Sequence, residues 1–398
     1  MHSLLALYLP ILISYAAILN GLLAGFGFSR VYLFIILIAI YLMITFGKPR
    51  RKLNEFQFIL QFIIFFSVAC FVGVLGQTEI FVVASAWFLY VGFCLYWTIY
   101  YLCFDDRFIY SILKSNIPAF FIVSAIAAVQ YFISPTFFGF LDNNTEAASW
   151  AINQVQSDYA YFFRPYSTTN SPQVMGLLMV FGFVLVWSLP KINHLFRVVC
   201  LIATMVGGVL SASKSFVLLL SLFLTYIAFK RLHRVSLASF FTHLIVIAIV
   251  IYMATVVSDE VPIFSRVISV DSILAQESED SRIDRYLSII SNTPLIGYGA
   301  GAQYTRKETG ALSAESYILY IYYELGILGV LSIFILWGAS FVRALRNKSE
   351  IHIIFLVLCF VSWTFVHAFL SPAFFLFWAL IIGSFSKRHA TFGKLPPN

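Results

Sequence analysis

The sequence predicts an all-α, polytopic integral membrane protein, a single transmembrane domain over residues 1–398 with about twelve transmembrane helices. The first observation is composition: 61% of the 398 residues are hydrophobic and only 11% are charged, whereas a soluble chain carries about 25% charged residues. A globular core cannot absorb so much apolar surface, but a bilayer can. The second is aromatic content, with 43 Phe, 22 Tyr and 7 Trp, which suits lipid-facing helices and interfacial belts.

Long apolar runs are the third observation. A transmembrane helix needs about 20 residues, and most runs approach that length. The run 314–342 is longer, so we expect it to tilt or to begin outside the membrane. The runs cover residues 3–23, 29–46, 56–75, 80–102, 116–134, 172–189, 195–211, 215–230, 236–256, 314–342, 350–369 and 373–386.

Charge gives the orientation. The net charge of +7 does not indicate a nucleic-acid partner, because the basic residues lie in short loops and not on one face of a domain. With both termini in the cytoplasm, the cytoplasmic segments hold 17 of the 25 Lys and Arg residues, as the positive-inside rule requires. The opposite orientation would place the cluster KPRRK (48–52) outside.

The cysteines fall in or at the edges of apolar runs, without the spacing of a metal site. We expect them to be small core hydrophobes outside any disulfide framework. They are Cys70, Cys94, Cys103, Cys200 and Cys359.

Two connections are long, 135–171 and 257–313, and the orientation places both on the outer side of the membrane. Most acidic residues lie in them. Loops of this length are usually functional or disordered. Their aromatic, Gly and Pro residues favour ordered structure.

The first two motifs each carry one cation. FFRPYSTTNSPQVMG (162–176) holds Arg164, and Pro172 then opens a span at the position where its missing N–H costs least. LSASKSF (210–216) holds Lys214 in a turn of only a few residues between two runs. Either cation could hold the phosphate of a bound lipid. The alternative is contact with ordinary lipid headgroups.

The third motif is EDSRIDRYLSIISNTPLIGYGAG (279–301), which predicts a short helix on or in the outer interface. Arg282 and Arg285 are three residues apart and therefore neighbours on its surface. Paired guanidinium groups match the oxygens of a diphosphate, and the alternative is local salt bridging with Asp280 and Asp284. Four residues form one apolar stripe: Ile283, Tyr286, Leu287 and Ile290.

The ends of this helix are also marked. Ser281 can cap its start and Pro294 ends it. Gly297, Gly299 and Gly301 then allow tight turns. Because no strand precedes these glycines, we do not expect a dinucleotide site.

The fourth motif, SAESYILYIYYELGILG, holds two carboxylates. Glu315 lies at the first turn of a span, where the helix dipole stabilises it. Glu324 lies well inside the span, where an ionisable group indicates function or a specific partner. The structural alternative for Glu324 is a bond to Tyr322, Tyr323 or a basic group of another helix. Tyr317 and Glu324 are candidate substrate-binding residues of this motif.

Taken in order, the four motifs resemble the O-antigen polymerase and O-antigen ligase superfamily of bacterial surface-polysaccharide assembly. The local signals are RPYSTTNSP, SASKS, SRIDRYLSIISNTPLIGYGAG and ESYILYIYYELGILG, and the likeness extends to the whole topology. It implies a GT-C-like helical fold and undecaprenyl-diphosphate-linked oligosaccharide substrates at the outer face of the bacterial inner membrane. It also implies that no metal or other cofactor is used, and that a chain-length regulator is a partner.

The resemblance implies a glycosyltransferase that polymerises these repeats, with the diphosphate held by Arg164, Lys214, Arg282 and Arg285. Glu315 is the candidate base for the attacking sugar hydroxyl. Ligases of the superfamily carry His where this chain has Glu315, which favours a polymerase. The family often has Arg where this chain has Lys214, and a Lys neutralises phosphate as a point charge.

Three alternatives stay open. The nearest is an O-antigen ligase or a related lipid-linked glycan transferase. A peptidoglycan-type polymerase of the shape-and-division family would need an Asp in its own motif context, which we do not find. A transporter or flippase is the alternative outside enzymes, but the chain shows no internal repeat and its charged motifs gather on one side.

Overall fold

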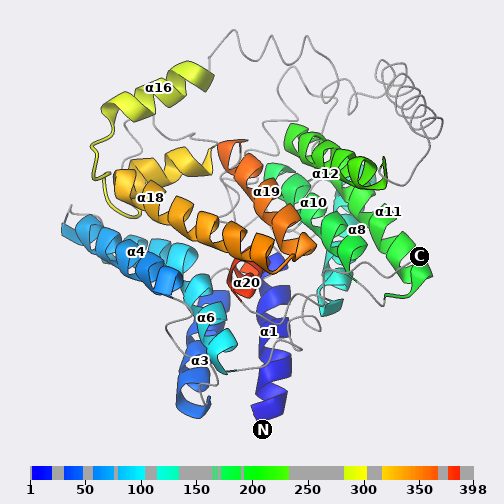
Figure 1. Ribbon diagram of the computed structural model, residues 1–398, viewed down its shortest axis with the longest axis horizontal. Coiled ribbons are helices and arrows are strands. Elements are labelled where there is room, and N and C mark those ends of the chain that lie inside the picture. The colour runs from blue at the N-terminus through cyan, green and yellow to red at the C-terminus, as the bar shows by residue number, and fades with distance from the viewer. Residues whose placement is uncertain are drawn as a thin grey trace.

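In the computed structural model (Figure 1), all regular structure of the described residues is helical. The described residues are 2–19, 31–47, 57–75, 79–103, 114–133, 165, 167, 172–189, 192–232, 282–302, 316–365 and 375–385.

Helices occupy eleven of the twelve predicted apolar runs, and the run 236–256 lies outside the described residues. The predicted short helix after residue 281 is also present, as α16. The elements are α1 (His2–Ile18), α3 (Val31–Phe46), α4 (Gln57–Leu75), α5 (Ile80–Trp87), the π-helical segment η2 (Phe88–Gly92), α6 (Phe93–Cys103), α8 (Ile117–Phe132), α10 (Pro172–Ser188), α11 (His194–Leu210), α12 (Lys214–Leu232), α16 (Arg282–Asn292), α18 (Tyr317–Arg346), α19 (Glu350–Phe365) and α20 (Phe375–Gly383).

Two helices of this set are long and apolar enough to cross a membrane. One is the continuous helix Ile80–Cys103, 24 residues formed by α5, η2 and α6, and the other is α18 with 30 residues. Several other apolar helices are shorter. The all-helical class is therefore confirmed, and the crossing of a membrane by the shorter helices stays a prediction.

The helices pack in two groups that α18 and α19 join. In one group α10 contacts α11 and α12, and α11 contacts α8; in the other α6 contacts α3 and α20. Helix α18 lies against α4 and α19 (Figure 1). Most of α10 is buried, which is why its sequence is apolar all round instead of striped.

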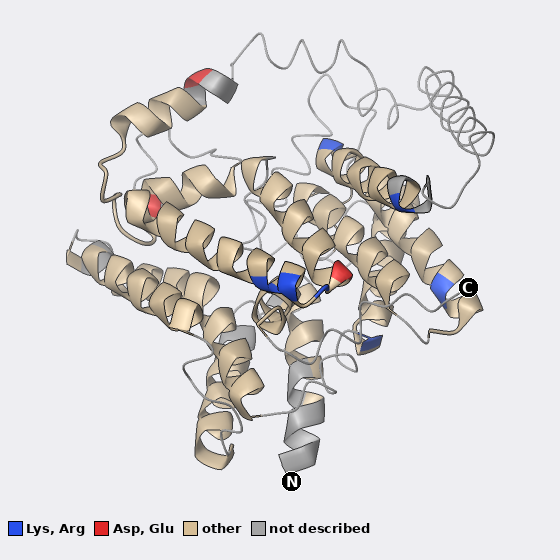
Figure 2. Cartoon of the chain, viewed as in Figure 1, with Lys and Arg blue, Asp and Glu red and all other residues tan. Residues whose placement is uncertain are grey.

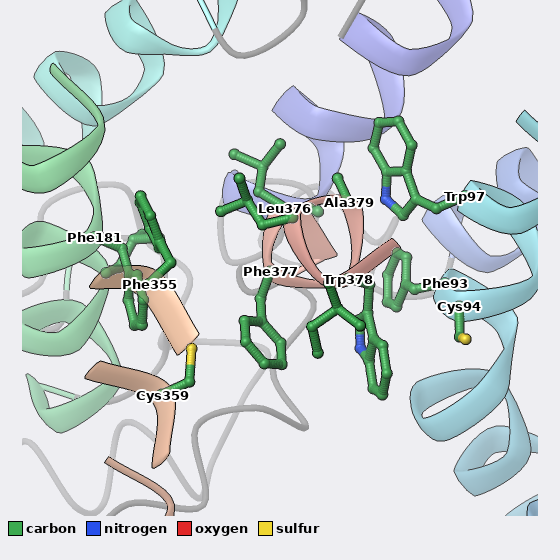
Figure 3. Close-up of a cluster of buried hydrophobic side chains, with 14 of the residues drawn as sticks. Phe93, Cys94, Trp97, Phe181, Phe355, Cys359, Leu376, Phe377, Trp378 and Ala379 are labelled. Atoms are coloured by element: carbon green, nitrogen blue, oxygen red, sulfur yellow. The ribbon is translucent and has the colours of Figure 1, made fainter. Parts of the chain in front are cut away.

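Helix α20 forms the centre of the core. Figure 3 shows Phe377 and Trp378 of α20 between α6 and α19. Nearby, Phe181 of α10 and Phe355 of α19 stack with ring centroids 5.2 Å apart, a geometry that adds to the gain from burial. All five cysteines are buried, as their prediction as core hydrophobes requires.

Candidate functional site

Helix α18 is broken at Gly326, where φ is +65° and ψ is −163°. Only glycine adopts this conformation readily, because a Cβ would clash with the backbone. A Cβ at Gly326 would also overlap the carbonyl of Leu295 and the backbone of Ile296. The break explains the unusual length of this run: residues 327–346 alone span about 30 Å, enough for a bilayer.

The segment that follows α16, residues 294–302, binds to this break through main-chain hydrogen bonds. The N–H of Tyr298 donates to the Tyr323 carbonyl over 2.9 Å, and the N–H of Gly299 donates to the Glu324 carbonyl over 2.7 Å. The N–H of Ile327 in turn donates to the Leu295 carbonyl over 2.9 Å. These bonds supply partners to backbone groups that the break removes from the helix, a requirement for irregular backbone in apolar surroundings.

The predicted turns of this segment are confirmed. Gly297, Gly299 and Gly301 all have positive φ. Gly297 lies against the backbone at Glu324, and Gly301 lies against Val82 at the start of α5, with no room for a side chain at either position. Gly297 and Gly301 therefore allow the segment 294–302 to pack closely against α18 and α5.

Glu324 is 0% exposed, and the hydroxyl of Tyr90 donates a hydrogen bond to its Oε2 over 2.8 Å. Tyr90 belongs to η2, a π-helical segment, and such segments occur often at functional sites. The Tyr90–Glu324 hydrogen bond thus joins the π-helical segment η2 to the part of α18 next to its break. The rings of Phe66 and Tyr320 lie 5.2 Å and 6.3 Å from the Tyr90 ring.

The interpretation of the sequence missed Tyr90 as the partner of Glu324. It proposed Tyr322, Tyr323 or a basic group, but the donor comes from a helix 234 positions earlier in the chain. Nothing in the sequence around Tyr90 indicates that it binds Glu324, so only the tertiary structure identifies this pair.

Helix α16 carries Arg282 and Arg285 and packs against α18; their side chains lie outside the described residues. The hydroxyl of Tyr298 donates to the Asn292 carbonyl over 2.6 Å, and the Tyr298 ring lies 4.9 Å from the Tyr323 ring. The two arginine positions are therefore tied to the broken part of α18, which carries Glu324.

Two residues of the apolar stripe predicted for α16 face outward. Leu287 and Ile290 are 57% and 48% exposed, while Ile289, outside the predicted stripe, is buried. An exposed apolar stripe on a short helix is what residence in a membrane interface requires.

The first two motifs converge on the C-terminal half of α8. The backbone N–H of Ser167, three residues after Arg164, donates to Oε1 of Gln130 in α8 over 2.8 Å. In the second motif, Leu210 and Ala212 pack against Ala128 and Tyr131 of the same helix. Arg164 itself lies outside the described residues.

Lys214 is the first residue of α12 and follows the short turn Ser211–Ser213. The N-terminus of a helix carries a partial positive charge and free N–H groups, so a cation there adds to a site that favours anions. Beside it, Ser213 Oγ is buried and makes no hydrogen bond to any described residue. The position thus has the charge and a donor for an anionic oxygen.

Gly176 in α10 lets the turn Ser211–Ser213 pack closely against that helix. A Cβ at Gly176 would lie 2.6 Å from Cβ of Ser213 and 2.7 Å from Oγ of Ser211. We expect Gly176→Ala to lower the free energy of unfolding by about 1–3 kcal/mol, because inserting a methyl group here forces the turn outward. Thermal unfolding of the purified protein in detergent measures this. Equal stability of the variant and the parent would show that the turn moves without cost.

The structure therefore brings the four motifs together in two groups: the first motif lies with the second, and the third lies with the fourth. Helix α19 lies between them, against α10 and α12 on one side and α18 on the other (Figure 1). Tyr317 is 1% exposed and its ring centroid lies 5.8 Å from that of Trp363 in α19, which makes it part of the core. Glu315, the candidate base, lies outside the described residues, next to the Ser316 that caps α18.

No protein-family model matches the chain, and no curated protein matches it either. The likeness to the O-antigen polymerase and ligase superfamily thus stays a prediction from the motifs.

Proposed function

We propose that this protein is a bacterial inner-membrane glycosyltransferase that polymerises undecaprenyl-diphosphate-linked oligosaccharide repeats at the outer face of the membrane. The observation that carries the proposal is the convergence of the Arg164 and Lys214 turns on one helix, α8, with Lys214 at the N-terminus of α12. A diphosphate leaving group needs several fixed cations in one place.

Exposed apolar side chains support a membrane location. On α3, Phe34 and Tyr41 are 65% and 66% exposed, and α4 exposes Phe71 and Leu75 in the same way. Soluble proteins rarely expose contiguous apolar patches larger than a few hundred Å². Figure 2 shows long helical stretches without charge, and the Lys and Arg residues that it colours lie mostly near helix ends.

Contacts between helix ends support the cytoplasmic side of the proposed topology. Near the end of α12, Tyr226 and Lys230 both donate to the carboxylate of Glu350 at the start of α19. Asn347 Nδ2 donates to the Ser384 carbonyl over 3.2 Å. The proposed orientation places all of these residues on the cytoplasmic side.

On the proposed outer side, Ser316 Oγ donates to the Trp363 carbonyl over 3.0 Å. One contact departs from the pattern: the hydroxyl of Tyr15 donates to the Ser115 carbonyl over 2.9 Å. The proposed topology puts Tyr15 in the outer half of α1 and Ser115 on the cytoplasmic side, so α1 fits the topology least well.

The proposed reaction is a displacement at the anomeric carbon of the growing chain. A hydroxyl of the new lipid-linked repeat attacks that carbon and loses its proton to Glu315, while the bond to the diphosphate oxygen breaks and its electron pair stays on the diphosphate. In this proposal the negative charge that develops there is stabilised by Arg164 and Lys214, whose turns both lie against α8. Arg282 and Arg285 belong to the group on the other side of α19 and stay candidate ligands of a lipid-linked diphosphate. Arginine forks bind the oxygens in pairs, and Lys214 acts as a point charge.

The sequence made Glu324 a candidate substrate-binding residue, but in this proposal it has a structural role. A carboxylate that is 0% exposed supports the site through the break in α18 and does not touch the sugars. Because the Glu324 carbonyl also binds the segment 294–302, the residue helps fix α16 and its arginines.

The test of the function is the pattern of surface polysaccharide in a strain that lacks the gene. Loss of the ladder of lengths, with one repeat still attached to lipid A–core, is expected of a polymerase. Loss of all surface polysaccharide, with polymer accumulating on the lipid carrier, would identify a ligase instead. An unchanged pattern would remove the protein from this pathway.

A lipid-linked glycan flippase is the second candidate, and the break in α18 favours it. Transporters often use discontinuous helices, with the substrate site at the break, and Glu324 lies beside this one. A flippase mutant would accumulate single repeats on the carrier at the cytoplasmic face. A polymerase mutant accumulates them at the outer face, where an added glycosidase can reach them in spheroplasts.

We expect Lys214→Ala to lower the polymerisation rate about 100-fold, because a cation opposite a developing charge contributes about 3 kcal/mol. Lys214→Arg should keep most of the activity, since it keeps the charge. The matched control is Lys230→Ala at the other end of α12, where an exposed ion pair with Glu350 is lost at a cost below about 1 kcal/mol. Equal activity of the two alanine variants would refute the role of Lys214.

A further inference from the structure

Gln130 is a buried amide that neither the motifs nor the proposed chemistry uses. It lies in α8, is 0% exposed, and binds both main-chain groups of a single residue, Ser167. Its Oε1 accepts from the Ser167 N–H over 2.8 Å, and its Nε2 donates to the Ser167 carbonyl over 3.5 Å. The amide therefore pairs with Ser167 as a strand residue pairs with its neighbour.

Ser167 needs such a clamp because its backbone is in the left-handed region, with φ of +50°. Residues other than glycine persist there only when their surroundings fix them from several sides. A third bond does this from the side chain, since Ser167 Oγ donates to the Val123 carbonyl of α8 over 2.7 Å. All three bonds join Ser167 to one helix, so among the described residues it is α8 that fixes the turn.

The clamped turn is three residues from Arg164, in the motif RPYSTTNSP. The same stretch of α8 contacts the second cationic turn, because Ala128 and Tyr131 pack against the cluster of Leu210 and Ala212. Ala212 itself has φ of +45°. Two strained turns, each next to a cation of the proposed site, thus rest on neighbouring residues of α8.

We infer that Gln130 is a positioning residue that fixes the turn at Ser167 against the stretch of α8 that also contacts the Lys214 turn, and that it acts on the affinity for the diphosphate of the lipid-linked donor through Arg164, three residues before Ser167. The inference rests on the proposed function and adds to it a residue that does not touch the substrate. Ser124, six residues earlier on α8, is a buried polar residue with a different surrounding: the contact described for its Oγ is with Met179 Sδ of α10, at 3.1 Å.

The test is a double-mutant cycle on the full chain in vesicles, with the lipid-diphosphate-linked repeat isolated from the deletion strain as donor and acceptor. We expect Gln130→Met to lower kcat/KM about 10- to 100-fold, because a small displacement of a binding group has effects of this size. The control, Ser124→Ala, should leave kcat/KM unchanged. Gln130→Glu keeps the acceptor for the Ser167 N–H, so it should lose less activity, and it replaces Gln130→Met if the methionine variant does not accumulate.

The decisive readout is Arg164→Ala combined with the Gln130 variant. If Gln130 acts through Arg164, the double variant has the same kcat/KM as Arg164→Ala alone. Multiplication of the two effects would mean a general structural role for Gln130 and would overturn the inference. Full activity of the Gln130 variants beside an inactive Arg164→Ala would overturn it as well, with the proposed function intact. Full activity of Arg164→Ala would instead remove the role of Arg164, and the inference with it.

Discussion

Gly326→Ala is expected to prevent most of the protein from accumulating in its folded form. The native φ and ψ at this position are open to glycine almost alone, and a Cβ there would overlap the Leu295 carbonyl and the backbone of Ile296. Together the backbone strain and the overlap cost about 3 kcal/mol or more. A loss of that size is a large part of the stability of a typical domain. Amounts of folded protein in membranes, measured by fluorescence size-exclusion chromatography, give the result.

The matched control for this substitution lies in the same helix. Gly338 has no atom within 4 Å of the place where its Cβ would be, so Gly338→Ala adds a methyl group in open space and favours the helix by about 1 kcal/mol. We expect it to accumulate at least as well as the parent. If both variants accumulated equally, the break at Gly326 would not be a required part of the fold.

The second large effect is expected from Tyr90→Phe. This change removes a hydroxyl that donates to the buried carboxylate of Glu324. Depriving a buried acceptor of a donor costs about 1–3 kcal/mol, and more when the acceptor is charged. The free energy of unfolding in detergent, or the thermal midpoint, measures the loss. Polymerisation should fall in parallel, because the main-chain carbonyl of Glu324 binds the segment that follows α16, and a displaced Glu324 displaces this carbonyl.

Tyr96→Phe is the matched control for Tyr90→Phe. Tyr96 lies in α6, the continuation of the same long helix, and its buried hydroxyl makes no hydrogen bond to a described residue. Removing it should be neutral or slightly stabilising, since no bond is lost and a buried polar atom disappears. A larger loss for Tyr96→Phe than for Tyr90→Phe would show that the Tyr90–Glu324 bond contributes little.

The sequence predicted the helices well because their signal is local. Length and hydropathy marked eleven runs that form helices, and Pro172 marked the start of α10 to the residue. Gly297, Gly299 and Gly301 were predicted to allow tight turns for the same reason: the conformational freedom of glycine is a property of the residue itself. The turn before Lys214 followed from the small number of residues between two runs.

What the sequence did not predict depends on contacts between distant helices. The break at Gly326 lies in the run ELGILG, whose pattern is that of an ordinary apolar helix. It forms because the segment 294–302 supplies hydrogen bonds in place of those of the helix. The π-helical segment around Tyr90 and the pairing of Gln130 with Ser167 have no periodic pattern either. Propensity is a weak guide wherever tertiary contacts of this kind decide the backbone.

The attachment of the segment 294–302 to α18 restricts which residues can occupy some of its positions much more than others. The three hydrogen bonds described between it and α18 join main-chain atoms, and every residue except proline offers the same N–H and carbonyl. Selection therefore acts on backbone shape at Gly297, Gly299 and Gly326, while residues such as Leu295 and Ile296, whose side chains are exposed, are free to drift. Many different side chains at these two positions are thus compatible with the same anchor.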